Sequence, residues 1–288
     1  MTASRVDMKS YDVYHIGISG GKDSQALLLW AKHESGLPHD KLHASFCDTG
    51  NEHDLTYAHI KMMADTIHPI TTIKPPLDFY ELAKKKGRFP STKARFCTQQ
   101  LKIYPTQKHV MQFQQDNKEV VLLSGVRAGE SAARAALPEL EWDEYYACDM
   151  YRPLLQWSVD DVWAILAKYN SQRNPLYEYG ARRVGCFPCI MSNKLELRTI
   201  AKHFPERIDM IRKAELETGK NGSTFFSRNK TPAQFRSLTI TNKAGEQMMV
   251  PTIDDVVQWS KTGSYRPRQY EMDLDDLAQC SSNLGACE

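Results

Sequence analysis

The sequence predicts an α/β fold in which a Rossmann-like parallel sheet is followed by a mostly helical C-terminal region. Two observations support this fold. Apolar runs typical of strands alternate with helical patterns from residue 11 onward, and the alternation ends near Asn193. Strands that alternate with helices pair in parallel, and the helices then cover both faces of the sheet. We therefore expect one domain at residues 1–193 and a helical region at residues 194–288 that ends in a cysteine-bearing tail.

The individual elements follow from apolar runs bounded by turn residues. Predicted strands span residues 11–18, 41–47, 70–73 and 119–126. Predicted helices span residues 24–33, a segment that begins near His53, residues 159–169, residues 195–217 as one or two helices, and residues 253–261. Ser158 is the expected N-cap of the helix at 159–169. Because ligands of parallel sheets bind beyond the C-terminal ends of the strands, the turns after the first, second and fourth strands should converge on one crevice.

The composition is that of a globular chain, with 41% hydrophobic residues, 25% charged residues and a net charge of +2. This small charge neither demands nor excludes a nucleic-acid partner. No apolar run approaches the length of about 20 residues that a membrane helix requires. The segment from Met1 to Ser10 is polar and does not resemble a signal peptide. We expect a cytoplasmic protein without a membrane partner.

The turn after the first predicted strand reads Ser19-Gly20-Gly21-Lys22-Asp23-Ser24 and leads directly into a helical pattern. A strand, a glycine-rich turn and a helix N-terminus bring several backbone N–H groups to one point, where a phosphate chain binds well. The two glycines permit close approach of an anion. Lys22 adds a mobile positive charge and is also a candidate catalytic residue. The spacing differs from that of the Walker loop. This turn predicts a nucleotide site.

Two further turns follow predicted strands and carry charged residues. Asp48 ends the second strand, and its carboxylate can hold a ribose hydroxyl or Mg²⁺. After the fourth strand, Arg127 and Arg134 can bind phosphate or sulfate oxygens in a bidentate manner, and Glu130 can orient one of them. Asp48 and the two arginines are therefore candidate catalytic residues. The candidate nucleotide-binding residues in these turns are Asp48, Thr49, Gly50, Gly125, Arg127 and Glu130.

Taken in order, these motifs resemble the phosphoadenylyl-sulfate (PAPS) reductase family within the N-type ATP pyrophosphatases, the adenine nucleotide alpha-hydrolase-like superfamily. The resemblance spans residues 11–193 and includes the family's Gly-x-Arg-x-x-Glu-Ser-x-x-Arg stretch. Glu52 and Thr56 match an acidic residue and a threonine that follow Asp-Thr-Gly in the family. The resemblance implies a domain that binds ATP with Mg²⁺, or PAPS or adenylyl sulfate (APS). The complete Gly-Gly-Lys-Asp-Ser loop favours intact ATP, because true PAPS reductases usually lack its Lys-Asp.

Cysteines in a chain without a secretion signal favour metal or redox chemistry over a disulfide framework. The seven cysteines are Cys47, Cys97, Cys148, Cys186, Cys189, Cys280 and Cys287. We expect Cys47, inside a predicted strand, and Cys148 to be buried core residues. The Cys186-Phe-Pro-Cys189 motif resembles the iron–sulfur corner of APS reductases. Cys97 matches an earlier cysteine pair of those proteins, in which Phe96 here replaces the first cysteine.

This replacement leaves three matched ligands for a [4Fe-4S] cluster, which requires four. Either tail cysteine is a candidate for the fourth position. We assign Cys280 to the metal with Cys97, Cys186 and Cys189, and Cys287 to catalysis as a reactive thiol. A second arrangement binds Zn²⁺ through both Cys-x-x-Cys residues and both tail cysteines, and leaves Cys97 free. A third leaves one iron open to bind sulfur, as in the thiolating enzymes that the chain resembles.

The segment from Lys84 to Lys102 is rich in basic residues and contains no acidic ones. Phe89, Phe96 and Tyr104 lie among or beside them. Such a segment can receive a polyanion, with aromatic faces for stacking, or it can neutralise nucleotide phosphates and an anionic cluster. The tryptophans expected in the core are Trp142, Trp157, Trp163 and Trp259.

The leading functional hypothesis is ATP-dependent adenylation of an acceptor oxygen, which releases AMP and pyrophosphate, followed by sulfur transfer at a metal–cysteine site. This scheme resembles DNA phosphorothioation and tRNA thiolation enzymes. The alternative is reduction of PAPS or APS by a tail thiol. A third hypothesis is a non-catalytic nucleotide-binding subunit of a DNA-modification or defence complex. The expected partners are an adenine nucleotide, a nucleic-acid acceptor or a sulfur-donor protein, and a second copy of the chain in a homo-oligomer.

Overall fold

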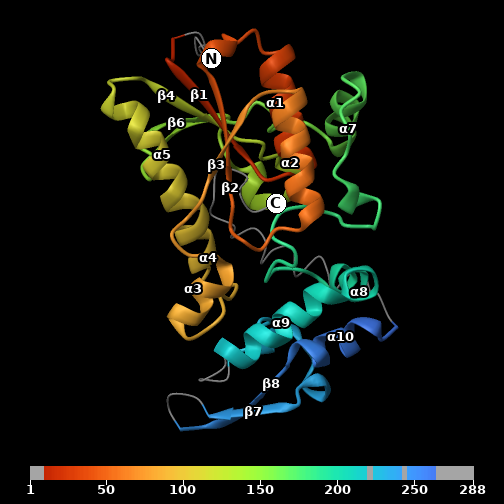
Figure 1. Cartoon of the computed structure of the whole chain (residues 1–288). Coiled ribbons are helices and arrows are strands. Elements are labelled where there is room, and N and C mark those ends of the chain that lie inside the picture. The colour runs from red at the N-terminus through yellow and green to blue at the C-terminus, as the bar shows by residue number, and fades with distance from the viewer. Residues whose placement is uncertain (1–9, 219–222, 242–244, 264–288) are drawn as a thin grey trace.

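The computed structural model describes residues 10–218, 223–241 and 245–263. Its centre is a six-stranded sheet in the order β3-β2-β1-β4-β6-β5 (Figure 1). All neighbouring strands run parallel except β5 and β6, which are antiparallel. The strands are β1 (Val13–Ile18), β2 (Leu42–Cys47), β3 (Ile70–Ile73), β4 (Val120–Leu123), β5 (Leu140–Asp143) and β6 (Cys148–Tyr151). The predicted α/β fold with a largely parallel sheet is confirmed.

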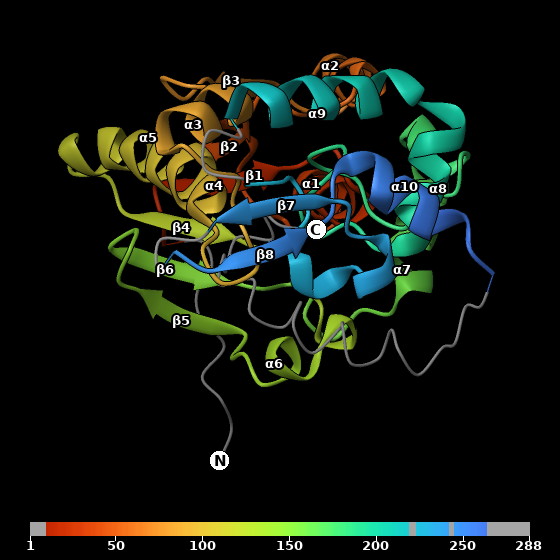
Figure 2. The same ribbon diagram turned by 90° about the horizontal axis from the view of Figure 1, so that it is seen from below.

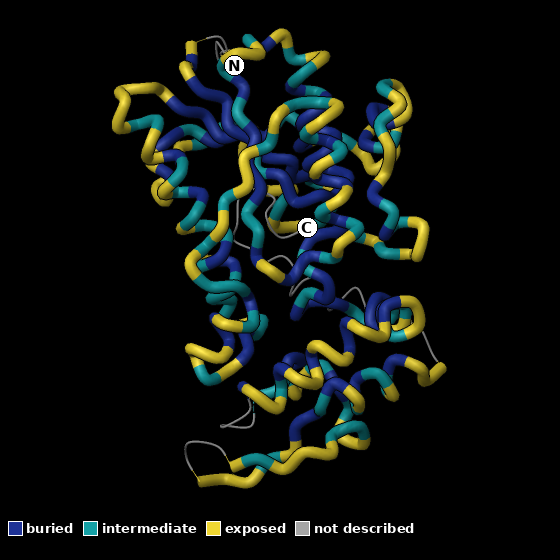
Figure 3. The backbone as a smooth tube through the Cα atoms, viewed as in Figure 1, coloured by how far each residue is buried: buried dark blue, intermediate teal, exposed yellow. Residues whose placement is uncertain are grey.

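Helices cover both faces of this sheet, because alternate residues of each strand point to opposite sides. Tyr14 and Ile16 of β1 lie in one buried cluster with residues of α1 (Lys22–His33), α2 (Asp54–Thr66) and α7 (Val159–Lys168). Val13 lies in a second cluster with Val110 of α5 (Tyr104–Gln115). The central strands are therefore buried on both faces, and they form the dark core of the molecule (Figure 3).

Local signals set most of the predicted helix starts. Ser158 caps α7: its side chain accepts a hydrogen bond from Asp161 N, and the Asp161 side chain accepts one from Ser158 N. His53 caps α2 by accepting from Leu55 N. α1 begins at Lys22 rather than at Ser24, so the last residues of the glycine-rich turn already belong to the helix. This places the predicted phosphate turn directly at a helix N-terminus.

Among its described residues, the C-terminal region contains three α-helices and a hairpin. The helices are α8 (Lys194–His203), α9 (Pro205–Thr218) and α10 (Ile253–Lys261), and the hairpin pairs β7 (Leu238–Thr241) with β8 (Gln247–Val250). Seen from below, this region lies in front of the sheet (Figure 2). Its helices share a third buried cluster with α3 (Phe79–Lys86), through Leu82 of α3 and Ile211 of α9. The mostly helical character is as predicted, whereas the hairpin was not expected; the domain boundary near Asn193 stays a prediction.

Several further elements were also missed by the sequence patterns. They are α3, α4 (Phe96–Thr98), a π-helical turn (Gln99–Ile103), α5, α6 (Ala132–Ala135), and strands β5 and β6. The expectation that Trp142 lies in the core is wrong. This residue is 61% exposed because it lies on the edge strand β5. Trp157, Trp163 and Trp259 were also expected in the core; they are partly buried and pack against the buried clusters. Within the described ranges, no helix combines the length and the apolar character needed to cross a bilayer.

Glu215 of α9 joins two later segments of the C-terminal region to its helix by hydrogen bonds. Its carboxylate accepts hydrogen bonds from Phe225 N and Ile253 N, both at 2.9 Å. Burial raises the pKa of Glu215 to about 7. The folded state therefore holds the Glu215 proton more tightly than the unfolded chain does.

This shift predicts a pH-dependent stability. A carboxyl whose pKa is raised in the folded state contributes fully below its unfolded value and loses that contribution as pH rises to about 7. From pH 5 to pH 8 the unfolding free energy should fall by about 1–3 kcal/mol more in the unmodified protein than in Glu215→Gln. Urea unfolding at both pH values measures this difference. Glu217→Gln on the same helix is the control, and an unchanged slope in Glu215→Gln contradicts the assignment.

Candidate functional site

The turn between β1 and α1 is fixed by hydrogen bonds among its own residues. Ser19 N donates to Ser24 Oγ at 3.2 Å, and the two serine hydroxyls lie 3.1 Å apart. Gly21 N donates to Ser19 Oγ at 3.2 Å. Gly20 has a φ of +80°, and a Cβ there would lie 2.6 Å from Thr56 Cγ2 of α2. The turn thus has a defined shape at the N-terminus of α1, which is the arrangement that binds phosphate groups.

Asp23 is the buried centre of the charged groups around this turn. Its side chain is fully buried, and its two oxygens have different partners. Lys22 Nζ lies 2.5 Å from Asp23 Oδ2, and Arg127 Nε lies 2.5 Å from Asp23 Oδ1. The β1–α1 turn and the loop after β4 therefore meet, as predicted. Arg127 Nε points at Asp23, and direct binding of a nucleotide by Arg127 stays a prediction.

Glu130 holds the loop after β4 in shape through a hydrogen bond and an ion pair. Glu130 Oε2 accepts a hydrogen bond from Arg127 N at 2.7 Å and lies 2.6 Å from Arg134 Nη1. The structure therefore pairs Glu130 with Arg134, one of the two arginines that it was expected to orient. Gly125 begins this loop, and a Cβ there would lie 3.2 Å from Asp23 O. Close backbone packing between the two loops accounts for this glycine.

The Asp-Thr-Gly turn after β2 is organised around two carboxylates. Tyr57 Oη donates to Asp48 Oδ1 at 2.6 Å, and Gly50 N donates to the same oxygen at 3.0 Å. Glu52 is buried and accepts hydrogen bonds from Thr49 N at 3.0 Å and from Thr49 Oγ1 at 2.7 Å. Burial, reinforced by Asp48, raises the pKa of Tyr57. The turn therefore presents carboxylates next to a phenol that stays protonated.

The Cys-x-x-Cys segment packs onto this same turn. Cys186 Sγ lies 3.6 Å from Thr49 Oγ1 and 3.7 Å from Glu52 Oε1. Burial raises the pKa of the Cys186 thiol. The structure thus brings a half-buried thiol to the turn that follows β2, although 134 residues separate it from Glu52 along the chain.

Two residues that sequence patterns did not single out hold the cysteine segment in place. Asn51 O accepts from Phe187 N at 2.7 Å, and Asn51 Nδ2 donates to Pro188 O at 3.0 Å. The buried Arg207 of α9 donates from Nε to Phe187 O at 2.7 Å and from Nη2 to Asn51 O at 3.0 Å. The arginine lies on the second C-terminal helix, and no motif marks it.

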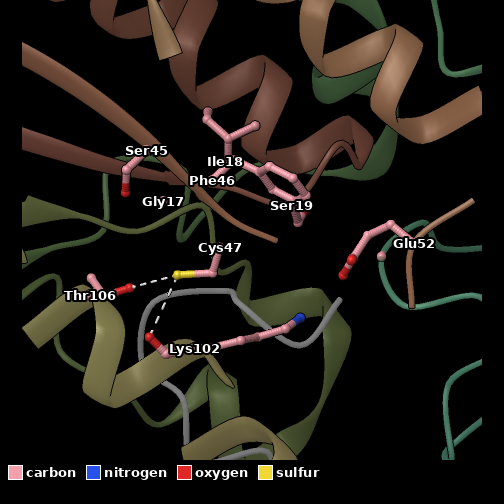
Figure 4. Close-up of a pocket in the computed structure, with 10 residues that line it drawn as sticks. Gly17, Ile18, Ser19, Ser45, Phe46, Cys47, Glu52, Lys102 and Thr106 are labelled. Carbon is pink, nitrogen blue, oxygen red and sulfur yellow. Dashed lines mark hydrogen bonds between the residues drawn. The ribbon is translucent and has the colours of Figure 1, made fainter. Parts of the chain in front are cut away.

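A pocket opens beside these groups at the C-terminal ends of β1 and β2 (Figure 4). Residues 17–19 and 45–47 line one side, and Glu52, Lys102 and Thr106 line the other. Cys47 was expected in the core, but it ends β2 at the pocket wall, where its thiol lies 3.2 Å from Thr106 Oγ1. Cys148 is buried in the core as expected.

The predicted metal ligands are only partly covered by the structure. Across residues 10–218, 223–241 and 245–263, no group of three or more His, Cys, Asp and Glu side chains is placed to hold a metal ion. Cys280 and Cys287 lie outside the described residues. Cys97, Cys186 and Cys189 are thus not placed as such a group within the described residues. The [4Fe-4S] cluster and the Zn²⁺ alternative stay predictions.

Comparison with known proteins agrees with the motif analysis. The model of the phosphoadenosine phosphosulfate reductase domain family matches residues 14–192. An uncharacterised 37.8 kDa protein of Escherichia phage 186 is 32% identical over 333 aligned positions, covering 95% of this chain and 96% of that protein. Adenosine 5'-phosphosulfate reductase of Allochromatium vinosum is 39% identical over 67 residues, which cover 23% of this chain and 26% of the reductase.

Among solved structures, the chain is similar to the PAPS reductase of Candida auris in its phosphate complex. The two are 20% identical, the match covers 62% of this chain and 84% of that one, and the TM-score is 0.49.

The fixed shape of the phosphate turn predicts that Gly20→Ala destabilises the protein more than Gly36→Ala does. Both glycines have positive φ, which costs another residue about 1–2 kcal/mol. A Cβ at Gly20 also meets Thr56 Cγ2 at 2.6 Å, whereas a Cβ at Gly36 meets nothing within 4 Å. Unfolding in urea compares the two variants. Equal losses would show that Thr56 does not constrain the turn.

Proposed function

Because the chain belongs to the phosphoadenosine phosphosulfate reductase domain family, we propose that it is an adenine-nucleotide enzyme of sulfur chemistry. Its specific reaction is adenylating sulfur transfer: ATP is split to AMP and pyrophosphate, and sulfur then replaces an acceptor oxygen. The observation that carries this proposal is the position of Cys186 Sγ, 3.6 Å from Thr49 Oγ1 in the turn beside the predicted nucleotide site. This contact supports the proposal because the predicted phosphate turn lies at the same end of the sheet.

The residues of the β1–α1 turn have separate roles in this reaction. Backbone N–H groups and Lys22 hold the pyrophosphate end of ATP, with Asp48 as the candidate ligand of Mg²⁺. The acceptor oxygen attacks the α-phosphorus of ATP and forms a bond to AMP. Pyrophosphate leaves with the electrons of the broken P–O bond. A hydrosulfide sulfur then displaces AMP, which departs with the acceptor's oxygen. Asp23 and Arg127 keep Lys22 in place, and the pair of Glu130 and Arg134 fixes the loop beside it.

A nucleic acid is the proposed acceptor, and the support is a stretch of the sequence that is rich in cations, one of which lines the pocket. Between Glu81 and Asp116 the chain has no acidic residue. Its cations there are Lys84, Lys85, Lys86, Arg88, Lys93, Arg95, Lys102 and Lys108. Lys102 lines the pocket, and Lys84 and Lys108 are exposed. Clustered cations of this kind bind a phosphate backbone. A sulfur-donor protein and self-association remain parts of the proposal.

Calorimetric titration with ATP and Mg²⁺ tests the nucleotide site. The unmodified protein should bind ATP, and Lys22→Met should weaken binding by about tenfold or more, since a charge-assisted hydrogen bond contributes about 1.5–3 kcal/mol. Lys32→Met, at the other end of α1, is the matched control and should bind normally. Failure of the unmodified protein to bind ATP contradicts the proposal.

Product analysis with ATP, Mg²⁺, hydrosulfide and total tRNA or DNA separates the possible reactions. AMP and pyrophosphate in equal amounts are expected, whereas ADP contradicts the proposal. The second candidate function is reduction of APS or PAPS, which the short match to APS reductases favours. Sulfite formation from APS with dithiothreitol as the thiol donor would support reduction and contradict adenylating sulfur transfer.

A further inference from the structure

The hydroxyl oxygen of Tyr177 accepts a hydrogen bond from a backbone N–H at the N-terminus of α1. Lys22 N, the first N–H of the helix, donates to Tyr177 Oη at 2.9 Å, across 155 residues of sequence. Gly21 is the N-cap and has no side chain to accept this bond. Helix N-terminal N–H groups require acceptors, and phosphate oxygens are strong ones. The phenol oxygen therefore stands where the proposed site requires a ligand oxygen.

Tyr177 is held there by a segment that is docked along α1. Gln25 Nε2 donates to Ser171 Oγ and to Gln172 O, both at 2.7 Å. Asn174 is fully buried; its Nδ2 donates to Gly20 O at 3.1 Å, and its Oδ1 accepts from Leu176 N at 3.0 Å. These bonds attach residues 171–177 to the phosphate turn and to the first turns of α1. The position of the phenol is thus part of the fold rather than a chance surface contact.

The ring of Tyr177 also contacts a tryptophan that can report its movement. Trp163 of α7 packs edge-on against the ring, with centroids 5.3 Å apart and planes at 89°. The Arg173 guanidinium lies 4.5 Å from the centroid of the same indole. Displacement of the phenol therefore changes the surroundings of Trp163.

We propose that Tyr177 is a placeholder for a phosphate oxygen and makes binding at this turn depend on the ligand's phosphate chain. The inference rests on the proposed nucleotide site. A ligand whose pyrophosphate reaches Lys22 N must displace the phenol, because one N–H cannot donate fully to both. A charged phosphate oxygen accepts more strongly than a phenol does, so the exchange is favourable. A nucleoside monophosphate lacks that group and leaves Tyr177 in place.

Calorimetry with pyrophosphate and with AMP, each with Mg²⁺, tests the placeholder. Tyr177→Phe keeps the ring and removes the competing oxygen, so pyrophosphate affinity should rise about two- to tenfold, the value of one net hydrogen bond. AMP affinity should not change, and this selectivity separates competition from a general effect on the fold. Tyr179→Phe makes the same chemical change two residues away, where the ring packs on Phe204 at 5.0 Å, and should alter neither affinity.

Tryptophan fluorescence supplies a readout that does not depend on the Tyr177 variant. Saturating pyrophosphate should change the emission of the unmodified protein, AMP should not, and Trp163→Phe should abolish the change. An unchanged or weaker pyrophosphate affinity in Tyr177→Phe overturns the inference and leaves the proposed function intact. If Tyr177→Phe does not fold, an unchanged Trp163 signal at saturating pyrophosphate overturns it. If the unmodified protein binds neither ATP nor pyrophosphate, both proposals fall.

Discussion

The buried carboxylate of Asp23 is the constraint on which the proposed site depends. An ionised group in the interior is stable only when it is paired and hydrogen-bonded, and Asp23 meets this condition with Lys22 on one oxygen and Arg127 on the other. Arg127 follows β4 and Asp23 follows β1, which are neighbouring strands of the sheet. Satisfying one buried charge therefore brings two loops together and fixes Lys22 at the start of α1.

A second set of contacts joins the cysteine segment to the same end of the sheet. Asn51 and Arg207 bind the backbone on both sides of the Phe187–Pro188 bond, next to Cys186. These are hydrogen bonds of buried groups, and loss of one partner would leave the other unsatisfied. The C-terminal helices thus support the site through α9 as well as shielding the core. The proposed sulfur chemistry beside a nucleotide rests on this arrangement rather than on either motif alone.

The sequence predicted the parts of the molecule that depend on local pattern. The Ser19–Ser24 turn, the start of a helix near His53, the cap at Ser158 and the meeting of the turns after the first and fourth strands all follow from short motifs and from the direction of parallel strands. The parts that it missed depend on distant partners. Arg207 contacts Asn51 across 156 residues, and Tyr177 contacts Lys22 across 155. Single-chain patterns carry no signal for such pairs. Trp142 and Cys47 were misjudged because strand position, edge or end, decides exposure more than residue type does.

A double-mutant cycle on Asp23 and Arg127 tests the central claim most directly. The free energy of unfolding is measured in urea for Asp23→Asn, Arg127→Met and the double variant. Each single change should cost about 3–5 kcal/mol, because it leaves a buried charge without that partner. The double variant should be more stable than the sum of the two losses predicts, by about 1.5 kcal/mol or more. Strictly additive losses would show that the two loops are not joined through this pair.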